Sequence, residues 1–98
     1  MIDYIEASLA RELRIGELAG VAEMSPYHFG KLFKESTGWT VHQYVMKRRL
    51  QRAMHLLSAR TLAISDAGAA VGLPNQSQFT KFFRQHTGIT PRRYQQFV

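Results

Sequence analysis

The feature that most constrains this chain is a direct internal repeat. Residues 29–44, FGKLFKESTGWTVHQY, align without a gap on residues 79–94, FTKFFRQHTGITPRRY, at an offset of 50 positions. The two copies share a pair of phenylalanines, a basic residue after the second phenylalanine, a Thr-Gly pair and a closing tyrosine. A direct repeat of this length predicts that the same supersecondary unit occurs twice in the fold.

Each copy contains the hydrophobic spacing of an α-helix. In residues 76–87, QSQFTKFFRQHT, a turn of about 100° per residue brings the aromatic side chains to one side of the helix. This inward side consists of Phe79, Phe82, Phe83 and His86. The outward side is polar and free of acids, with Ser77, Lys81 and Arg84 at its centre and Gln76, Gln78 and Thr80 on its flanks. Such a helix can be anchored by one side and can bind a partner with the other.

The rest of the chain also has helical spacing, and an all-α fold of seven helices with short turns is expected. The predicted helices cover residues 2–10, 15–24, 26–37, 41–59, 64–72, 76–87 and 92–97. Hydroxyl caps mark three helix starts, at Ser25-Pro26, Thr40 and Thr90-Pro91. Glycines mark helix ends at Gly38, Gly72 and Gly88, and residues 60–63 are a predicted break. No segment has a strand pattern of comparable strength.

The repeated unit is a short helix, a tight turn and a second helix with a polar outer face, which is the pattern of a helix-turn-helix. The predicted organisation is one DNA-binding domain, residues 1–98. It comprises a first helix-turn-helix lobe at residues 1–39, a connecting helix at 40–59 and a second lobe at 60–98. In this motif the second helix enters the DNA major groove. Two alternatives stay open: a helical protein-interaction module, and an RNA-binding domain.

Charge is distributed unevenly along the chain, whose net charge is +6. Residues 1–35 hold four Lys/Arg against six Asp/Glu, a net charge of −2. Residues 36–98 hold nine Lys/Arg against Asp66 alone, a net charge of +8. A basic globular domain indicates a polyanionic partner such as double-stranded DNA.

Other function classes lack their sequence signatures. The chain has no cysteine, and no two of its four histidines have the spacing of a helical zinc pair, so no metal site or cofactor is expected. No serine lies in a nucleophile elbow, and no enzyme activity is expected. No apolar run reaches the roughly 20 residues of a membrane span. The absence of cysteine fits a reducing compartment, and a cytoplasmic location is expected.

The outward helix faces supply the candidate DNA contacts. Side chains suited to base edges are expected to be Tyr27, His28 and Lys31 in the first lobe and Gln76, Gln78, Thr80 and Lys81 in the second. Phosphate contacts are expected from Ser25, Lys34, Thr40, Arg84, Thr90, Arg92 and Arg93. Core positions are expected for the aromatic residues Phe29, Phe33, Trp39, Tyr44, Phe79, Phe83 and Tyr94.

Over nearly its full length the sequence resembles the DNA-binding region of the AraC/XylS family of bacterial transcription regulators. The matching first-lobe segments are LAGVAEMS at 18–25, F-x-x-L-F-K at 29–34, T-G at 37–38 and Tyr44. The match continues through Arg49-Leu50, Ala53 and Leu56-Leu57 to F-x-x-x-F-R at 79–84 and T-G-x-T-P-x-x-Y at 87–94. The last run is the most specific.

The resemblance implies two helix-turn-helix lobes joined by a long helix and sequence-specific binding of double-stranded DNA at the bacterial nucleoid. Nineteen helical residues span roughly 28 Å, close to the ~34 Å between successive major grooves, so both recognition helices are expected in adjacent grooves. Activation of transcription is the commoner role in the family, with RNA polymerase as a second partner. Family members usually carry a ligand-sensing domain, absent from these residues, so either the chain is a fragment or it acts through abundance alone.

Two features depart from the family pattern. An Ile-Ala pair and a Gly-Phe turn are usual in the second lobe, but here they read Ala67-Gly68 and Gly72-Leu73. Gly30 lies in the first recognition helix where a polar side chain is common, and we place it on the outer face. We therefore expect the first recognition helix to read fewer bases than the second, or to dock closer to DNA.

Overall fold

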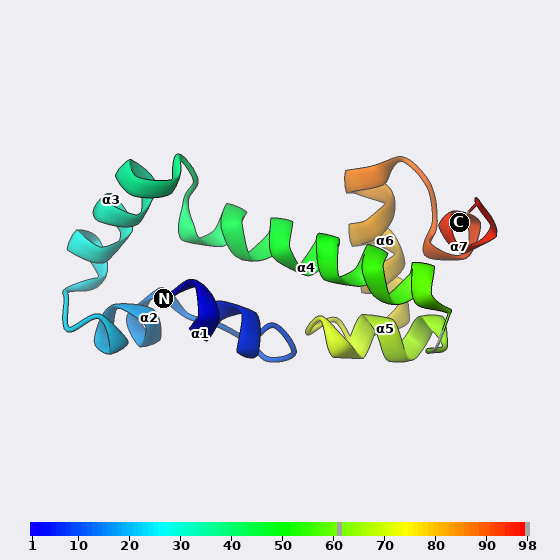
Figure 1. Cartoon of the computed structure of the whole chain (residues 1–98), viewed down its shortest axis with the longest axis horizontal. Coiled ribbons are helices and arrows are strands. Elements are labelled where there is room, and N and C mark those ends of the chain that lie inside the picture. Colours follow the sequence, from blue (N-terminus) through cyan, green and yellow to red (C-terminus); the bar gives the residue numbers. More distant parts are fainter. Residues whose placement is uncertain (61, 98) are drawn as a thin grey trace. The chain divides into compact units, whose positions relative to one another are not determined.

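The computed structural model describes residues 1–60 and 62–97; Thr61, within the predicted break, and Val98 lie outside the described residues. Its described part is all-helical (Figure 1). The helices are α1 (Ile2–Ala7), α2 (Ile15–Val21), α3 (Pro26–Thr37), α4 (Val41–Ala59), α5 (Ile64–Ala70), α6 (Gln76–Thr87) and α7 (Pro91–Phe97). The predicted all-α fold with two helix-turn-helix units is confirmed.

The helices form two compact units, Met1–Arg48 and Arg49–Val98. The long helix α4 crosses the boundary, so its first half belongs to the first unit and its second half to the second. The predicted division into a first lobe at residues 1–39, a connecting helix at 40–59 and a second lobe at 60–98 stays a prediction.

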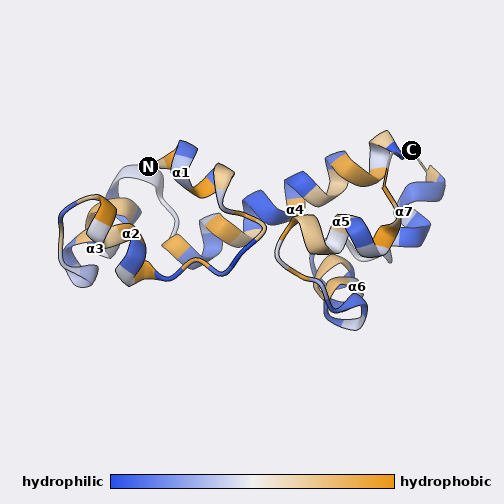
Figure 2. Cartoon of the chain, turned by 90° about the horizontal axis from the view of Figure 1, so that it is seen from below, coloured by the Kyte–Doolittle hydropathy of each residue, from blue (hydrophilic) through white to orange (hydrophobic). Residues whose placement is uncertain are grey.

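Each unit buries its own hydrophobic core. Figure 2 shows apolar residues (orange) alternating with polar ones (blue) along the helices. The buried residues of the first unit are Ile5, Leu9, Leu18, Ala19, Phe29, Phe33 and Val45. Those of the second are Ala53, Leu57, Ala67, Val71, Phe79 and Phe83. Full burial of a phenylalanine stabilises a fold by roughly 1.5–3 kcal/mol, so the recognition helices are firmly attached by their aromatic sides.

The repeat seen in the sequence is also a repeat in packing. Tyr44 meets Phe33 edge-on with ring centroids 5.4 Å apart, and Tyr94 meets Phe83 edge-on at the same 5.4 Å. The threonine that ends each recognition helix donates its hydroxyl to the carbonyl four residues earlier, at 2.8 Å in both units. The two units therefore hold α3 and α6 in equivalent ways.

Three helices are shorter than the periodicity predicts. The first ends at Ala7 rather than at residue 10, because the Ser8 amide bonds back to the Ile5 carbonyl and the chain leaves the helix. Leu9 is still buried, so apolar spacing marks it as core without requiring it to be helical. Helix α2 ends at Val21 and α5 at Ala70, where each turn toward a recognition helix begins.

Left-handed backbone ends several of these helices. Gly38, Gly72 and Gly88 have φ of 81°, 83° and 84°, as their glycine identity predicted. The position in the first unit that corresponds to Gly72 is Glu23, which adopts φ of 58°. A residue with a Cβ in this region costs roughly 1–2 kcal/mol, so the first turn holds strain that the second avoids.

The two small residues Ala19 and Gly20 of α2 have different surroundings. Ala19 is buried in the core, but Gly20 faces open space, with nothing within 4 Å of a Cβ built there. Gly20 therefore does not create a close helix approach. The close approach occurs instead at Gly68 in α5, where a Cβ would lie 2.8 Å from the Leu73 carbonyl oxygen.

A polar network tethers α1 to α2. The Arg11 guanidinium donates to Glu17 Oε1 at 2.9 Å and to the Tyr4 hydroxyl at 3.2 Å, while the Tyr4 hydroxyl donates to Glu17 Oε2. Hydrogen bonds from Arg11, then from Tyr4, lower the pKa of Glu17 to about 2. This network stabilises the first unit on a side of α2 that carries none of the candidate DNA contacts.

Candidate nucleic-acid interface

Helix α6 is fixed at both ends and along its inner side. The Asn75 side chain accepts a hydrogen bond from the Gln78 amide at 3.1 Å, which caps the helix start. Phe79 and Phe83 are fully buried, and Gly88 ends the helix in a left-handed turn. Asn75 was not identified from the sequence, although an asparagine directly ahead of a helical segment is a common cap.

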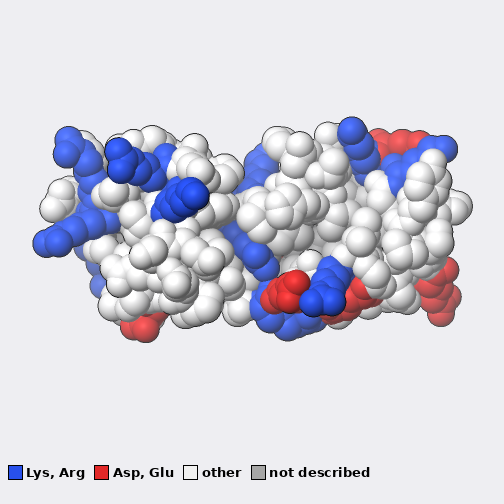
Figure 3. Space-filling view, turned by 180° about the vertical axis from the view of Figure 1, so that it is seen from behind, with Lys and Arg blue, Asp and Glu red and all other residues white. Residues whose placement is uncertain are grey.

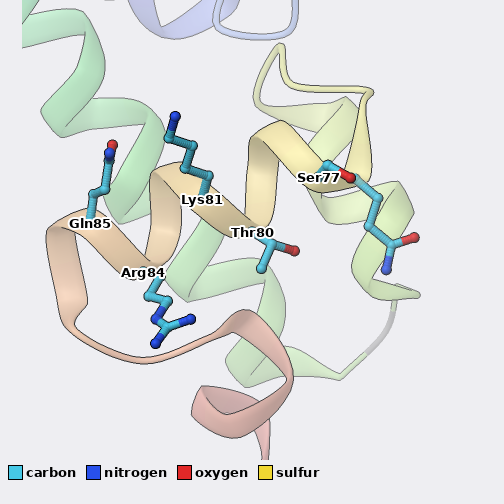
Figure 4. Close-up of a pocket in the computed structure, with 6 residues that line it drawn as sticks. Ser77, Thr80, Lys81, Arg84 and Gln85 are labelled. Carbon is cyan, nitrogen blue, oxygen red and sulfur yellow. The ribbon is translucent and has the colours of Figure 1, made fainter.

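The outer side of α6 forms an open hollow lined by six side chains, five of them labelled in Figure 4. They are Gln76, Ser77, Thr80, Lys81, Arg84 and Gln85. Four of these were predicted, three as base contacts and Arg84 as a phosphate contact. The hollow contains two cations, two amides and two hydroxyls and no carboxylate, which is a set that suits base edges and phosphates.

The sequence prediction missed two residues of this hollow and included one outside its lining. Ser77 was placed on the outward face but was not chosen as a contact, and Gln85 was not named. Both lie one turn from Lys81 and share its face by the i, i+4 rule. Gln78 is solvent-exposed but does not line the hollow. Periodicity correctly gave the face of the helix, but not which flanking residues belong to it.

Helix α3 is held in the same manner. The Ser25 hydroxyl accepts from the His28 amide at 3.2 Å, and Phe29 and Phe33 are buried. The predicted contact residues of this helix are all solvent-exposed: Tyr27, His28, Lys31 and Lys34. Tyr27 is the extreme case, at 81% exposed, and it corresponds to Ser77 in the repeat.

Gly30 lies on the flank of α3 that faces α2 rather than in the middle of the outer face, which corrects the sequence analysis. A Cβ at this position would point toward α2 and meet the Ile15 Cδ1 atom at 3.2 Å. Its counterpart in α6 is Thr80, which lines the hollow there, so Gly30 marks the edge of the α3 face that adjoins α2. The expectation that the first recognition helix reads fewer bases than the second, or docks closer to DNA, stays a prediction.

Trp39 is also placed differently from the expectation. It is 40% exposed rather than buried, and the Lys47 ammonium lies 4.4 Å from the centre of its ring. This is a cation–π contact on the surface of the first unit. The other six aromatic residues assigned to the core are buried or half-buried as predicted.

The two units divide the charge less sharply than residues 1–35 and 36–98 do, with net charges of 0 and +6. The first unit contains six Lys/Arg and six Asp/Glu, whereas the second contains seven Lys/Arg and only Asp66. On the face in Figure 3, basic side chains predominate over the second unit and acidic ones lie among basic ones over the first. The whole net charge of +6 is thus carried by the second unit.

The described residues hold neither a metal-binding cluster nor a membrane-spanning helix. No group of three His, Cys, Asp or Glu side chains among them could hold a metal ion. No helix in the described chain is both long and apolar enough to cross a membrane.

Comparison with known proteins identifies the family. The model of the helix-turn-helix domain family matches residues 18–96. The chain is 38% identical to a probable transcriptional regulator, LumQ, from Photobacterium leiognathi, over 98% of this chain and 39% of that protein. An AraC-type regulator structure from Chromobacterium violaceum superposes with a TM-score of 0.86 at 28% identity, covering 97% of this chain and 85% of that one. This chain is an AraC/XylS-type DNA-binding domain.

A further structure shows the fold of this AraC/XylS-type domain in a relative. The DNA-binding domain of AdpA, solved in complex with a target DNA, superposes with a TM-score of 0.89 at 22% identity, covering 98% of this chain and 86% of that one. The domain spans about two fifths of the length of LumQ.

The helix starts expected to meet phosphates are capped in this AraC/XylS-type domain. Thr40 Oγ1 accepts from the Gln43 amide at 3.1 Å, and Gln43 Oε1 accepts from the Thr40 amide at 3.1 Å, which forms a capping box. Thr90 Oγ1 accepts from the Arg93 amide at 3.2 Å. The threonine hydroxyl hydrogens are not used in these bonds, so each can still be donated to a phosphate oxygen.

The last helix of the domain adds a second basic surface. Arg92 lines a hollow with Arg60, Leu62, Gln95 and Gln96. The Arg60 guanidinium donates to the Gln95 carbonyl at 2.8 Å, which joins the end of α4 to α7. Arg93 lies with its guanidinium 5.7 Å from the centre of the Phe97 ring. Both predicted phosphate-contact arginines of α7 are solvent-exposed.

Proposed function

We propose that this domain binds double-stranded DNA sequence-specifically and regulates transcription through α3 and α6. The observation that carries the proposal is the α6 hollow. It is polar, cationic and without an acid, and it lies on a helix whose opposite side is fixed by two buried phenylalanines. Membership of the AraC/XylS family and the DNA complex of AdpA support the same function.

The duplicated unit supports a binding mode in which one chain occupies two adjacent major grooves. The repeat is direct rather than two-fold symmetric, so the DNA site need not be palindromic. Helix α4 has 19 residues and a length of roughly 28 Å, comparable to the ~34 Å between grooves. Light scattering or sedimentation of the complex should therefore give one protein per duplex, and two proteins on a palindrome would contradict this mode.

The contact roles proposed for the two faces follow the sequence assignments with the structural corrections. Lys81, Gln76 and Thr80 read base edges from the α6 hollow, with Ser77 and Gln85 added to the same surface. Tyr27, His28 and Lys31 read from α3, and Gln78 is a flanking contact. The phosphate contacts are Ser25, Lys34, Thr40, Arg84, Thr90, Arg92 and Arg93.

The wider role is that of an activator within a longer bacterial regulator. A domain that covers about two fifths of LumQ leaves room for a ligand-sensing domain in the whole protein. RNA polymerase is the second partner in this proposal, and the protein acts in the cytoplasm at the nucleoid.

The test is selection of bound sites from a random duplex pool, followed by titration of the selected duplex. The affinity for the selected duplex should fall steeply between 50 and 200 mM salt, because each phosphate contact releases counterions. A duplex of shuffled sequence is the matched control, and it should bind more weakly at every salt concentration.

Two outcomes would favour other functions. A-form RNA conceals its major groove from a helix, so preferred binding of duplex or single-stranded RNA over duplex DNA would overturn the proposal. Binding to a protein partner with little salt dependence, and none to DNA, would instead indicate a protein-interaction module.

A further inference from the structure

The repeat allows the two recognition faces to be compared residue by residue. Phe29 and Phe33 are buried as Phe79 and Phe83 are, both helices begin at a side-chain cap, and both end in a left-handed glycine. A position on α3 therefore has the same orientation within its unit as the position 50 residues later on α6. The α6 hollow can be used to identify the corresponding surface of α3.

This comparison assigns Glu35 to the recognition face. Its counterpart is Gln85, which lines the α6 hollow together with Lys81 and Arg84. The hollow extends from Gln76 to Gln85. These two residues are nine helical steps, or about 14 Å, apart along the helix, which is close to the ~12 Å width of a major groove. Glu35 is solvent-exposed, and it lies one turn beyond Lys31 on α3.

A carboxylate on a DNA-facing helix is unusual, because it repels phosphates. The three ion pairs described in the first unit join Arg11 to Glu17, Arg14 to Glu12 and Arg48 to Glu6, and none of them includes Glu35. The first unit also has no net charge with which to offset the repulsion. In a complex with DNA, a carboxylate in this position is favourable where it accepts a hydrogen bond from a base.

We propose that Glu35 is a specificity-determining residue that selects a cytosine in the half of the DNA site bound by α3. This inference rests on the proposed function. The cytosine N4 amino group is a major-groove donor, and carboxylates are its usual acceptors, whereas Lys31 one turn away is suited to the guanine O6 and N7 acceptors. The first half-element therefore contains a G·C-rich step, while the amides of α6 suit adenines in the second.

The same carboxylate lowers binding to DNA of other sequence. Where no amino group faces it, Glu35 meets a carbonyl oxygen or a phosphate and weakens the complex. The second unit, which carries the net positive charge, supplies the sequence-independent attraction. The first unit then discriminates among the sites at which the second unit has already bound.

The test compares Glu35→Gln with the reciprocal change Gln85→Glu. Both variants, the wild-type chain and the control Glu12→Gln are used to select duplexes from one random pool, and then titrated on the wild-type site and its single-base variants. Glu12 is exposed, pairs with Arg14 at 3.3 Å and lies outside both recognition helices, so it controls for net charge.

Glu35→Gln should lose the cytosine preference at one position by at least about fivefold and shift it toward adenine, which glutamine can bind bidentately. For non-specific DNA, the slope of the logarithm of the binding constant against the logarithm of the salt concentration should become steeper by about 0.9. Between 50 and 200 mM salt the variant should therefore lose about 3.5-fold more affinity than the wild type does. Gln85→Glu should gain a cytosine preference in the second half-element. Its salt dependence on non-specific DNA should become shallower by about the same amount, about 0.9 in slope. Glu12→Gln should leave every base preference unchanged.

The failures are distinguishable. If wild-type protein selects no sequence, the proposed function itself is wrong. If it selects a sequence and Glu35→Gln selects the same one with unchanged cytosine preference, Glu35 does not read a base. Uniformly tighter binding of Glu35→Gln to all duplexes also overturns the proposal, since it would make Glu35 a repulsive charge alone.

Discussion

Replacing Gly68 with alanine should destabilise the second unit, although alanine is the better helix former. A Cβ at this position of α5 would lie 2.8 Å from the Leu73 carbonyl oxygen and 2.9 and 3.0 Å from the Cγ and Cδ2 atoms of Phe79. These distances are too short for real contacts. The backbone amide of Leu73 also donates a hydrogen bond to the Gly68 carbonyl at 2.8 Å. Leu73 therefore cannot move away from position 68 without straining that bond.

The magnitude follows from two opposing effects. Alanine gains up to ~1 kcal/mol of helix propensity over glycine. Overpacking a fixed core costs about 1–3 kcal/mol, and simultaneous overlap with backbone and a buried ring places Gly68 at the upper end. The net loss is about 1–2 kcal/mol, or roughly 5–15 °C in melting temperature for a domain of this size.

Thermal and urea unfolding followed by circular dichroism measure this loss, with two other glycines as controls. Gly20→Ala adds a methyl into open space and should raise stability by up to ~1 kcal/mol. Gly30→Ala meets only the end of the half-exposed Ile15 side chain, so it should be neutral or stabilising. A Gly68→Ala protein that melts at or above wild type would refute the reasoning. It would mean that α5 shifts freely to the spacing that Ala19 has in the first unit.

Four further predictions concern the interface and the first unit. Lys81→Ala should cost about 1–3 kcal/mol on the selected duplex and relax preference at one position, whereas equal losses on all duplexes would assign Lys81 to phosphate. Arg84→Ala should weaken all duplexes alike and lower the salt slope by about one, and a loss confined to one sequence would contradict a phosphate contact. Glu23→Gly should raise the free energy of unfolding by roughly 0.5–1 kcal/mol, because glycine adopts a φ of 58° without strain. Urea titration measures this change. A decrease would show that the Glu23 side chain stabilises the fold by more than the backbone strain costs. The pKa of Glu17 is lowered to about 2 by hydrogen bonds from Arg11 and Tyr4, so its stabilising effect is complete above its unfolded pKa of about 4.3 and is lost as pH falls toward 2. The stability difference between wild type and Glu17→Gln should accordingly shrink between pH 5 and about 2, and a pH-independent difference would contradict it.

Local features of the chain were readable from the sequence because they depend on near neighbours. The serine cap at Ser25, the left-handed glycines at 38, 72 and 88, and the aromatic anchors of α3 and α6 all follow from rules that act within one or two turns. The 50-residue repeat extended these rules to both units, because the helix-turn-helix pattern found in one copy predicts the same structure for the other. Family membership followed from the same residues.

The tertiary structure decided what depends on a contact between helices. The direction of Gly30 was set by Ile15 of α2, which periodicity along α3 alone does not locate. The need for glycine at position 68 comes from the Leu73 carbonyl and the Phe79 ring, which approach from a turn and from another helix. The membership of Gln85 in the α6 hollow likewise became visible only in the folded surface. Sequence determines the face of each helix through its periodicity, but the distance between packed surfaces is set by the side chains that meet there.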